Sequence, residues 1–415
     1  MKKFRTLKQG IEWIETRIKF KPKTDLSKMH EAILMLGTKN DFLRIHVAGT
    51  NGKGSTTSFV SNILMCSGYK VGTFLSPYLV KFNERIRINM VEIGDDDLLR
   101  LINFIFEFNE QFTIKNGESL SFFELLTLLA LKHFNEVGCN AVVMEVGLGG
   151  LLDSTNALTY DLSLITNIGF DHMKQLGDTL ESIAYNKLGI LKKDGILVST
   201  VDERLLPQFI KFAKEKHAKF IHISANDISI ISHNPLKFKY MYLVFEPKLL
   251  GDYQSSNASL AIKGIKELGL DISDRQIIDG INQTTNPGRL EILSLRPLVI
   301  IDGAHNIHGI DALVSAIKTM STGNIWVIFS SLKDKNPVQM LNRLDTISDN
   351  IILTTFDDPR VLSVTDVLME KNNVLFIKDY KTAYKYVKKN MSENDTILIT
   401  GSIHFIGYVK KVLKK

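Results

Sequence analysis

The chain has 415 residues, of which 44% are hydrophobic and 23% are charged, as in a globular enzyme of two or three domains. The 51 Lys and Arg against 45 Asp and Glu give a net charge of +6. Because no RNA- or DNA-binding motif accompanies this charge, we expect anionic small-molecule substrates and no nucleic-acid partner. No uncharged run could span a bilayer, and two cysteines do not form a disulfide framework. We expect a cytoplasmic protein without a membrane partner.

The first predicted elements lead to a glycine-rich loop. Residues 7–37 predict two short amphipathic helices. Residues 43–47 predict a strand, residues 49–54 a tight turn, and residues 55–66 a helix. A strand, a loop exposing backbone N–H groups, Lys53 and the positive end of a helix dipole together form a phosphate cradle. The stretch predicts ATP-dependent chemistry; the alternative is a connection that binds nothing.

Strands and helices alternate through the next two hundred residues. The alternation favours an α/β fold with a mostly parallel sheet covered on both faces. The predicted strands are 70–75, 140–146, 162–167, 196–200 and 219–223, with an antiparallel addition at 236–246. The predicted helices are 95–108, 121–137, 179–193, 251–268 and one that runs from the N-cap Ser273 to Gln283. Ser121 and Glu124 predict a capping box at the start of the second of these helices.

One carboxylate interrupts the apolar strand at 140–146. Glu145 lies near the carboxyl end of this strand, where open α/β sheets bind their ligands. A buried carboxylate needs a cation, a hydrogen-bond donor or a proton. Metal ligation is the interpretation we prefer.

Arg85 lies in a segment that mixes cations with apolar residues, Tyr78 to Asn89. The segment predicts either a substrate-binding loop or an edge strand whose charges face water. Spacing alone leaves both interpretations open.

The strongest break in the second half is Asn286-Pro287-Gly288, after which a new α/β series begins. Its predicted strands are 298–302, 325–330, 350–355, 373–377 and 395–400. We therefore predict an ATP-binding domain over 1–288, a hinge over 289–297 and a smaller α/β domain over 298–415.

An ordered set of motifs resembles the folylpolyglutamate synthase and dihydrofolate synthase family, which is related to the Mur ligases. The nucleotide loop itself departs from the usual P-loop, since Gly54 and not Ser or Thr follows Lys53. The motifs are Ala48-Gly-Thr-Asn-Gly-Lys-Gly-Ser55, Ser76-Pro77, Glu84-Arg85-Ile86, Glu145-Val-Gly-Leu-Gly-Gly150, Leu152-Asp-Ser-Thr-Asn156, Thr166-Asn-Ile-Gly-Phe-Asp-His172, Lys187-Leu-Gly-Ile190, Pro287-Gly-Arg-Leu-Glu291, Asp302-Gly-Ala-His-Asn306 and Thr400-Gly-Ser402.

The resemblance implies a Mur-ligase-like central domain with a P-loop and a Rossmann-like C-terminal domain. It implies an ATP-dependent ligase that adds L-glutamate to the carboxylate of dihydropteroate or a reduced folate through an acyl phosphate, as a dihydrofolate synthase, a tetrahydrofolate (folylpolyglutamate) synthase, or both. One alternative is a Mur-type ligase acting on a cell-wall precursor. Another is a regulatory protein that binds ATP without turnover. We expect a monomer.

The resemblance also assigns roles to residues of the first domain. Lys53, His172 and Lys187 are expected to be catalytic, and a carbamate on Lys187 would bridge to the second of two Mg²⁺ ions. The alternative for Lys187 is an ordinary lysine on a helix surface. The phosphate-binding residues would be Thr50, Asn51, Gly52, Lys53, Gly54 and Ser55. The metal ligands would be Ser55, Ser76, Glu145, His172 and Lys187, and the substrate contacts Asp153 and Arg85.

Four residues of the second half complete the expected nucleotide site: Arg289, Asp302, His305 and Asn306. Since they follow the break, we expect an interdomain active site completed by closure. The alternative for the loop at 302–306 is a strand–turn–helix connection with a capping Asn. Two residues depart from the family pattern: Leu151 replaces an Arg, and Asn186 replaces an acidic residue before Lys187.

Overall fold

The computed structural model describes residues 3–19, 23–371 and 374–413. The chain forms two compact units, Met1–Ile228 with Ser256–Thr284, and Ser229–Ser255 with Thr285–Lys415. This division differs from the predicted boundaries, because 229–255 groups with the second unit. The predicted hinge at 289–297 contains a strand, β12 (Glu291–Leu295). Within the described ranges, no helix is long and apolar enough to cross a membrane.

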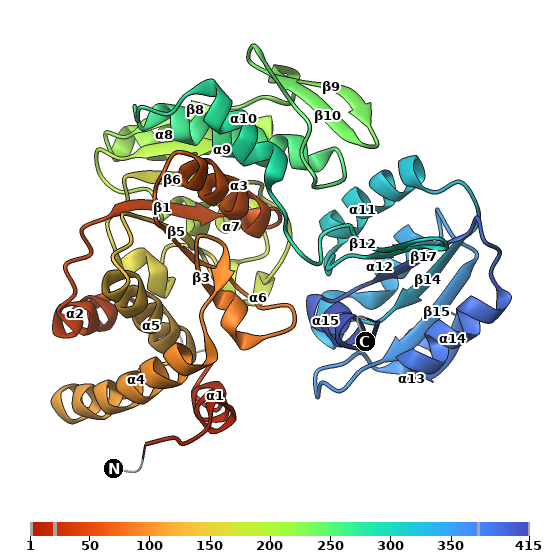
Figure 1. Ribbon diagram of the computed structural model, residues 1–415, viewed down its shortest axis with the longest axis horizontal. Helices are drawn as coiled ribbons and strands as arrows, with labels where there is room; N and C mark the ends of the chain where they lie inside the picture. Colours follow the sequence, from red (N-terminus) through yellow and green to blue (C-terminus); the bar gives the residue numbers. More distant parts are fainter. Residues whose placement is uncertain (1–2, 20–22, 372–373, 414–415) are drawn as a thin grey trace. The chain divides into compact units, whose positions relative to one another are not determined.

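An eight-stranded sheet forms the centre of the first unit (Figure 1), and its strand order is β4-β3-β2-β5-β1-β6-β7-β8. From β2 to β8 neighbouring strands are parallel, while β3 and β4 add antiparallel at one edge. The strands are β1 (Leu43–Ala48), β2 (Val71–Phe74), β3 (Ile86–Ile88), β4 (Val91–Glu92), β5 (Ala141–Glu145), β6 (Leu162–Ile165), β7 (Ile196–Ser199) and β8 (Lys219–His222).

Helices cover both faces of this sheet, as a mostly parallel sheet requires. The helices are α1 (Leu7–Glu15), α2 (Ser27–Leu36), α3 (Lys53–Cys66), α4 (Asp95–Asn116), α5 (Phe122–Glu136), α6 (Met173–Leu176), α7 (Leu180–Leu188), α8 (Leu206–Glu215), α9 (Tyr253–Glu267) and α10 (Asp274–Gln283). Alternation along β6 shows the two faces. Leu164 lies against Gly264 of α9, whereas Ile165 packs in the cluster that contains Ile183 of α7.

Helices α3 and α10 lie side by side (Figure 1) at a distance that only a glycine allows. A Cβ atom on Gly280 of α10 would lie 2.6 Å from the Cα atom of Ile63 in α3. Because α3 begins at the glycine-rich loop, this contact fixes the helix whose N-terminus faces the expected phosphate site.

The second unit contains a six-stranded sheet in the order β12-β13-β17-β14-β15-β16, antiparallel only between β12 and β13. Its strands are β13 (Leu298–Ile301), β14 (Ile325–Phe329), β15 (Asn350–Thr355), β16 (Leu375–Asp379) and β17 (Thr396–Thr400). A small sheet precedes it, in the order β11-β10-β9: β9 (Ile228–His233), β10 (Leu236–Tyr240) and β11 (Leu243–Phe245).

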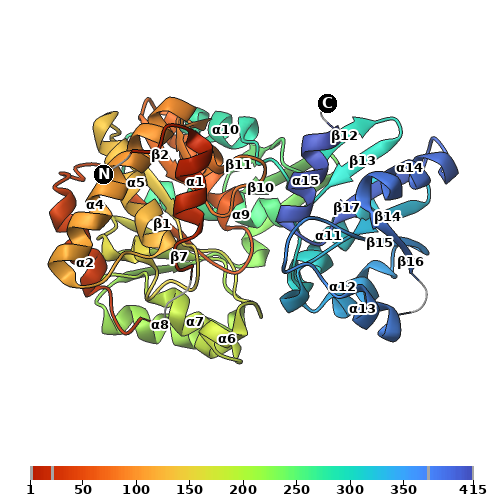
Figure 2. The same ribbon diagram turned by 90° about the horizontal axis from the view of Figure 1, so that it is seen from below.

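Helices cover both faces of the six-stranded sheet: α11 (Ile307–Met320), α12 (Pro337–Leu344), α13 (Val364–Glu370), α14 (Tyr380–Asn390) and α15 (Ile403–Leu413). Figure 2 shows α11, α12 and α13 on one face and α14 and α15 on the other. The core between the sheet and the first three helices includes Val327, Leu398, Leu313 and Met340.

The predicted α/β architecture is confirmed, including the capping box at Ser121 and the N-cap at Ser273. Helix α4 extends to Asn116, eight residues beyond its predicted end at 108. The prediction for 373–377 includes residue 373, which lies outside the described residues; the strand itself is Leu375–Asp379.

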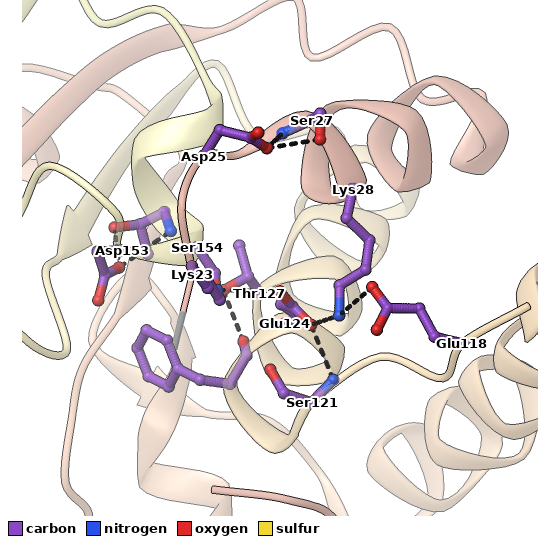
Figure 3. Close-up of polar contacts among 12 residues, drawn as sticks. Lys23, Asp25, Ser27, Lys28, Glu118, Ser121, Glu124, Thr127, Asp153 and Ser154 are labelled. Atoms are coloured by element: carbon purple, nitrogen blue, oxygen red, sulfur yellow. Dashed lines mark hydrogen bonds and ion pairs between the residues drawn. The ribbon is translucent and has the colours of Figure 1, made fainter. Parts of the chain in front are cut away.

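A buried carboxylate links three segments of the first unit (Figure 3). Glu124, 1% exposed, pairs with Lys23 at 2.9 Å and with Lys28 at 3.1 Å. It also accepts a 2.8 Å bond from the Ser121 N–H at the start of α5, and Lys23 donates to the Ser154 hydroxyl at 3.1 Å. Burial alone would raise the pKa of Glu124, but Lys23, the Ser121 N–H and Lys28 together lower it to about 2.

We predict that Glu124→Gln lowers the free energy of unfolding at pH 7 by about 3 kcal/mol, because it removes the buried carboxylate between two largely buried ammonium groups and leaves Lys28 paired with the more exposed Glu118, at 3.5 Å. Since the folded-state pKa is below the ordinary value of 4.5, the difference between wild type and variant is fully present above pH 4.5. It is lost as the pH falls toward 2. Denaturant unfolding across this range measures it.

Glu136→Gln is the matched control. Glu136 pairs with Arg100 at 2.8 Å, but its side chain is 30% exposed, so we expect a loss below about 1 kcal/mol. Equal losses in the two variants would contradict the importance of the Glu124 network.

Candidate active site

Parallel pairing brings the ends of four strands to one edge of the first unit's sheet. Strand β1 lies between β5 and β6, and β2 lies on the far side of β5. The register pairs Val47 with Glu145, Ala48 with Ile165, and Phe74 with Met144. The loops that follow these strands are therefore neighbours, and they carry the nucleotide loop, Ser76, the 147–153 loop and the 166–172 loop.

The glycine-rich loop is held by the loop after β6. The Thr50 N–H donates to the Asn167 carbonyl at 2.8 Å, and the Asn51 N–H donates to the Asn167 side chain at 2.9 Å. The Thr166 hydroxyl donates to the Asn51 carbonyl at 2.6 Å. Gly49 has φ +146°, and a Cβ atom there would lie 1.7 Å from the Thr166 hydroxyl oxygen. These contacts fix the conformation of the loop, which leads into the first turn of α3.

Two lysine amines approach the same carbonyl of this loop. Lys53 donates to the Gly49 carbonyl at 3.0 Å and to that of Thr50 at 3.1 Å. Lys187, on α7, donates to the Gly49 carbonyl at 2.8 Å. Burial, and then the nearby charge of Lys53, lowers the pKa of Lys187 to about 7. Lys187 is therefore a buried amine that exchanges its proton near neutral pH, and the alternative of a surface lysine is wrong.

The oxygen donors predicted for a metal lie at the same edge. Glu145 ends β5, is 4% exposed, and accepts a 2.8 Å bond from the Ser76 N–H. Ser55 is buried in the first turn of α3. His172, at the start of α6, has φ +53° and a side chain that is 41% exposed. Its backbone N–H donates to the Asp171 carboxylate. In the described part of the chain, no three His, Cys, Asp or Glu side chains gather as a metal site, and the predicted set includes only two of these.

Asp153 organises the glycine-rich run after β5. One carboxylate oxygen accepts from the N–H groups of Gly147 at 3.1 Å and Leu148 at 2.9 Å. The other accepts from the Thr155 N–H at 3.0 Å and the Thr155 hydroxyl at 2.6 Å. Burial raises the pKa of Asp153, against these hydrogen bonds. The carboxylate predicted to contact substrate therefore also fixes the backbone of the loop.

A histidine that the sequence analysis missed supports this arrangement. His46 on β1 is fully buried, its Nε2 atom lies 2.7 Å from the Thr155 hydroxyl, and its ring stacks on Tyr160 at 4.0 Å. Because Thr155 donates to Asp153, the neutral His46 ring donates to Thr155. Burial lowers the pKa of His46 well below its ordinary value. In the sequence, His46 was simply one polar residue in an apolar strand.

Arg85 is buried and does not face water. It ends a 3₁₀ turn, η1 (Phe82–Arg85), and its guanidinium carbon lies 4.9 Å from the Tyr78 ring centre and 5.5 Å from those of Phe82 and Phe122. Burial lowers its pKa to about 10. The edge-strand alternative is wrong, because β3 pairs with β2 on one side and β4 on the other.

The two departures from the family pattern contact each other. The Leu151 N–H donates to the Asn186 carbonyl at 2.7 Å, and a Cβ atom on Gly189 would lie 2.5 Å from the Leu151 Cβ atom. The Asn186 side chain donates to carbonyls of Leu176 and Ser182. Both residues therefore pack the 147–153 loop and the α6 segment against α7, the helix that carries Lys187.

In the second unit, the loop after β13 carries three predicted nucleotide-site residues. Asp302 is 4% exposed and accepts from the N–H groups of Leu290 and Ala304, each at 2.8 Å. His305 lies 2.9 Å from the Gly303 carbonyl. Asn306 is the N-cap of α11 and accepts from the Gly309 N–H at 2.8 Å. The capping alternative is thus correct for Asn306.

The shifted pKa of Lys187 gives a stability test. Because the folded-state pKa is about 7 against an ordinary 10.5, the folded state binds fewer protons than the unfolded state between these values, and stability rises with pH. We predict that the free energy of unfolding of wild type, relative to Lys187→Met, rises by about 2 kcal/mol from pH 7 to pH 9. Denaturant unfolding in buffers free of carbon dioxide measures this. Parallel pH profiles would contradict the assignment.

Family models match both halves of the chain, and known proteins match it over most of its length. The Mur ligase middle domain matches residues 98–263, and the Mur ligase glutamate ligase domain matches residues 288–403. The chain is 35% identical to the dihydrofolate synthase/folylpolyglutamate synthase of Bacillus subtilis, over 99% of this chain and 100% of that protein. It is 31% identical to the folylpolyglutamate synthase of Lacticaseibacillus casei, over 89% of each.

Solved structures give the same result. Escherichia coli FolC in complex with DHPP and ADP superposes with a TM-score of 0.90 at 28% identity, over 100% of this chain and 99% of that chain. A structure described as an FPGS–AMPPCP complex superposes with a TM-score of 0.86 at 27% identity, over 99% of this chain and 100% of that chain. The chain belongs to the folylpolyglutamate synthase/dihydrofolate synthase family of ATP-dependent glutamate ligases, within the Mur ligase superfamily.

Proposed function

We propose that this protein uses ATP to join L-glutamate to the carboxylate of dihydropteroate, of a reduced folate, or of both. The observation that carries the proposal is the glycine-rich loop with the amines of Lys53 and Lys187 on one carbonyl. The family relatives named for both synthase activities support the acceptor class. A Mur-type reaction on a cell-wall precursor is less well supported, because the full-length relatives carry folate names.

The reaction needs two bond exchanges. A carboxylate oxygen of the acceptor attacks the γ-phosphorus of ATP, the bond to the β–γ bridging oxygen breaks, and ADP leaves. The amine of glutamate then attacks the acyl carbon, the C–O bond to phosphate breaks, and the amine nitrogen loses a proton as the amide forms. Both steps crowd anionic groups together, so catalysis depends on positioning and on fixed positive charge.

The nucleotide loop supplies fixed positive charge in our proposal. Residues Thr50 to Ser55 surround the first turn of α3, where backbone N–H groups point out of the helix. The Lys53 amine, which donates to the loop's own carbonyls at 3.0 and 3.1 Å, is within reach of phosphates bound there. The hydrogen bond that Thr166 donates and those that Asn167 accepts hold the loop in this shape before ATP binds.

The donor set at the strand ends fits Mg²⁺. Glu145 offers a buried carboxylate, and Ser55 and Ser76 offer hydroxyl oxygens, which are the hard ligands that Mg²⁺ prefers. Bound there with His172, Mg²⁺ would offset the phosphate charge. The Ser76 N–H holds the Glu145 carboxylate at this edge.

Lys187 has the properties that carbamylation requires, and we propose that it is carbamylated. Its amine is buried and its pKa is about 7, so a large neutral fraction exists at physiological pH. The neutral nitrogen attacks the carbon of CO₂ and loses a proton, which yields a carbamate anion. This group would be a ligand for a second Mg²⁺ ion.

On the acceptor side, we propose that Asp153 and Arg85 contact the substrate, and that Arg289, Asp302, His305 and Asn306 of the second unit contact the nucleotide. Arg85 is a buried cation among aromatic rings, suited to an anionic ligand that excludes water.

The monomeric state and cytoplasmic location stay predictions from the sequence, which gel filtration and cell fractionation would test.

We predict that the purified protein releases phosphate only when ATP, L-glutamate and an acceptor are all present. Comparing dihydropteroate with tetrahydrofolate assigns the acceptor. Lys53→Ala should lower kcat by about 100-fold, because a preorganised positive charge is lost, whereas Lys8→Ala, at a side chain that is 86% exposed, should retain activity. Release with neither acceptor from folded, ATP-binding protein would contradict the folate assignment, and muropeptide acceptors would then be the next substrates to assay.

The carbamate has its own spectroscopic test. With ¹³C-bicarbonate, we predict a ¹³C carbamate resonance in wild type that is absent from Lys187→Arg, since an arginine at this site stays protonated. The resonance should grow as the pH rises through 7, as the amine loses its proton. Identical spectra from wild type and variant would rule out carbamylation at this residue.

A further inference from the structure

The loop that carries Arg289 adopts a strained shape. Gly288 has φ +79° and Leu290 has φ +42°, so two left-handed residues flank the arginine. Leu290 is only 2% exposed. A left-handed non-glycine residue costs about 1–3 kcal/mol and persists only where its surroundings hold it. Separate contacts hold the loop on each side of Arg289.

On one side, the loop after β13 holds the strained backbone. The Asp302 carboxylate accepts from the Leu290 N–H at 2.8 Å. The Gly303 N–H donates to the Gly288 carbonyl at 2.9 Å. A Cβ atom on Gly303 would lie 3.2 Å from a guanidinium nitrogen of Arg289. The arginine therefore lies against the 302–304 backbone, which fixes its direction.

On the other side, a buried ion pair holds the same backbone. One carboxylate oxygen of Glu291 accepts from the Gly288 N–H at 2.8 Å and from the Lys410 amine at 2.6 Å. The Lys410 side chain is 7% exposed and that of Glu291 is 21% exposed. Lys410 comes from α15, the last helix of the chain. A buried ammonium holds its carboxylate strongly in place, because neither group is well solvated alone.

We propose that Lys410 is a positioning residue for nucleotide use. Through Glu291 it holds the Gly288 N–H and so sets the backbone from which Arg289 extends; this rests on the proposed contact of Arg289 with the nucleotide. Lys410 itself touches no reacting atom. Without Lys410, the Glu291 carboxylate is free to move. The hydrogen bond from the Gly288 N–H to this carboxylate then no longer fixes the backbone on that side of Arg289.

The chain offers a matched control in the same unit. Lys371 is also 7% exposed and pairs with Asp345, which is 30% exposed, but it lies at the end of α13 and contacts neither 286–291 nor 302–306 through that pair. Lys410→Met and Lys371→Met each remove a buried ammonium from an ion pair. Both should lower stability, measured by denaturant unfolding, by similar amounts.

Steady-state kinetics separates positioning from stability. We expect Lys410→Met to lower kcat/KM for ATP roughly tenfold, with the KM for L-glutamate changed by less than about twofold. Lys371→Met should leave both parameters near wild type, and Lys410→Arg should restore kcat/KM for ATP. Glu291→Gln, which keeps an oxygen for the Gly288 N–H but loses the charge, is the second variant if Lys410→Met does not fold, and should show the same selective loss.

The variant Arg289→Ala separates the positioning role of Lys410 from the nucleotide contact of Arg289. If Arg289→Ala lowers kcat/KM for ATP while Lys410→Met and Glu291→Gln behave like Lys371→Met, the positioning role is overturned and the nucleotide role of Arg289 stands. If Arg289→Ala leaves kcat/KM for ATP unchanged, the proposed nucleotide contact fails, and the role of Lys410 fails with it.

Discussion

The parallel register of β2, β5, β1 and β6 is the constraint on which the rest of the site depends. Pairing Val47 with Glu145 and Ala48 with Ile165 places the ends of these strands level. A slip of one residue would turn the side chain of Glu145 to the other face of the sheet. The contacts from Glu145 to the Ser76 N–H, and from Thr166 to the Asn51 carbonyl, exist because the register is this one.

Two buried carboxylates of the first unit, those of Asp153 and Glu124, are hydrogen-bonded in ways that also shape the loops. The Asp153 carboxylate accepts four hydrogen bonds from its own loop, and Glu124 joins Lys23 and Lys28 to the start of α5. Lys187 reduces the cost of burial by a lowered pKa. Charge in a low-dielectric setting thus both fixes backbone and prepares reactive groups.

Local patterns predicted the parts of the fold that depend on local chemistry. The glycine-rich turn, the capping box at Ser121 and the carboxylate at the end of β5 follow from residue type and spacing, and all are present. Helix α4 was predicted too short, because its last two turns are mostly polar and follow no simple apolar period. Strand β12, which lies within the segment predicted as a hinge, was not predicted, since its pairing with β13 is a tertiary contact.

Partners distant in sequence could not be predicted. Glu124 was recognised for its bond to Ser121 three residues away, while Lys23 lies a hundred residues earlier in the chain and has no pattern that points to Glu124. The burial of Arg85 depends on Phe122, and the neutral state of His46 depends on packing around Thr155 and Tyr160. Motif resemblance located Arg85 and Thr155 in the chain, but only the fold shows what surrounds them.

In the reaction that we propose, the acceptor carboxylate is activated by direct phosphorylation. The most direct measurement uses an acceptor whose carboxylate is labelled with ¹⁸O, with unlabelled ATP and L-glutamate, followed by mass analysis of the released phosphate. Because the attacking oxygen stays with phosphorus when the acyl carbon–oxygen bond breaks, we predict one ¹⁸O atom in each phosphate released by ligation. Phosphate without ¹⁸O, released at the same rate as the amide product forms, would contradict this prediction.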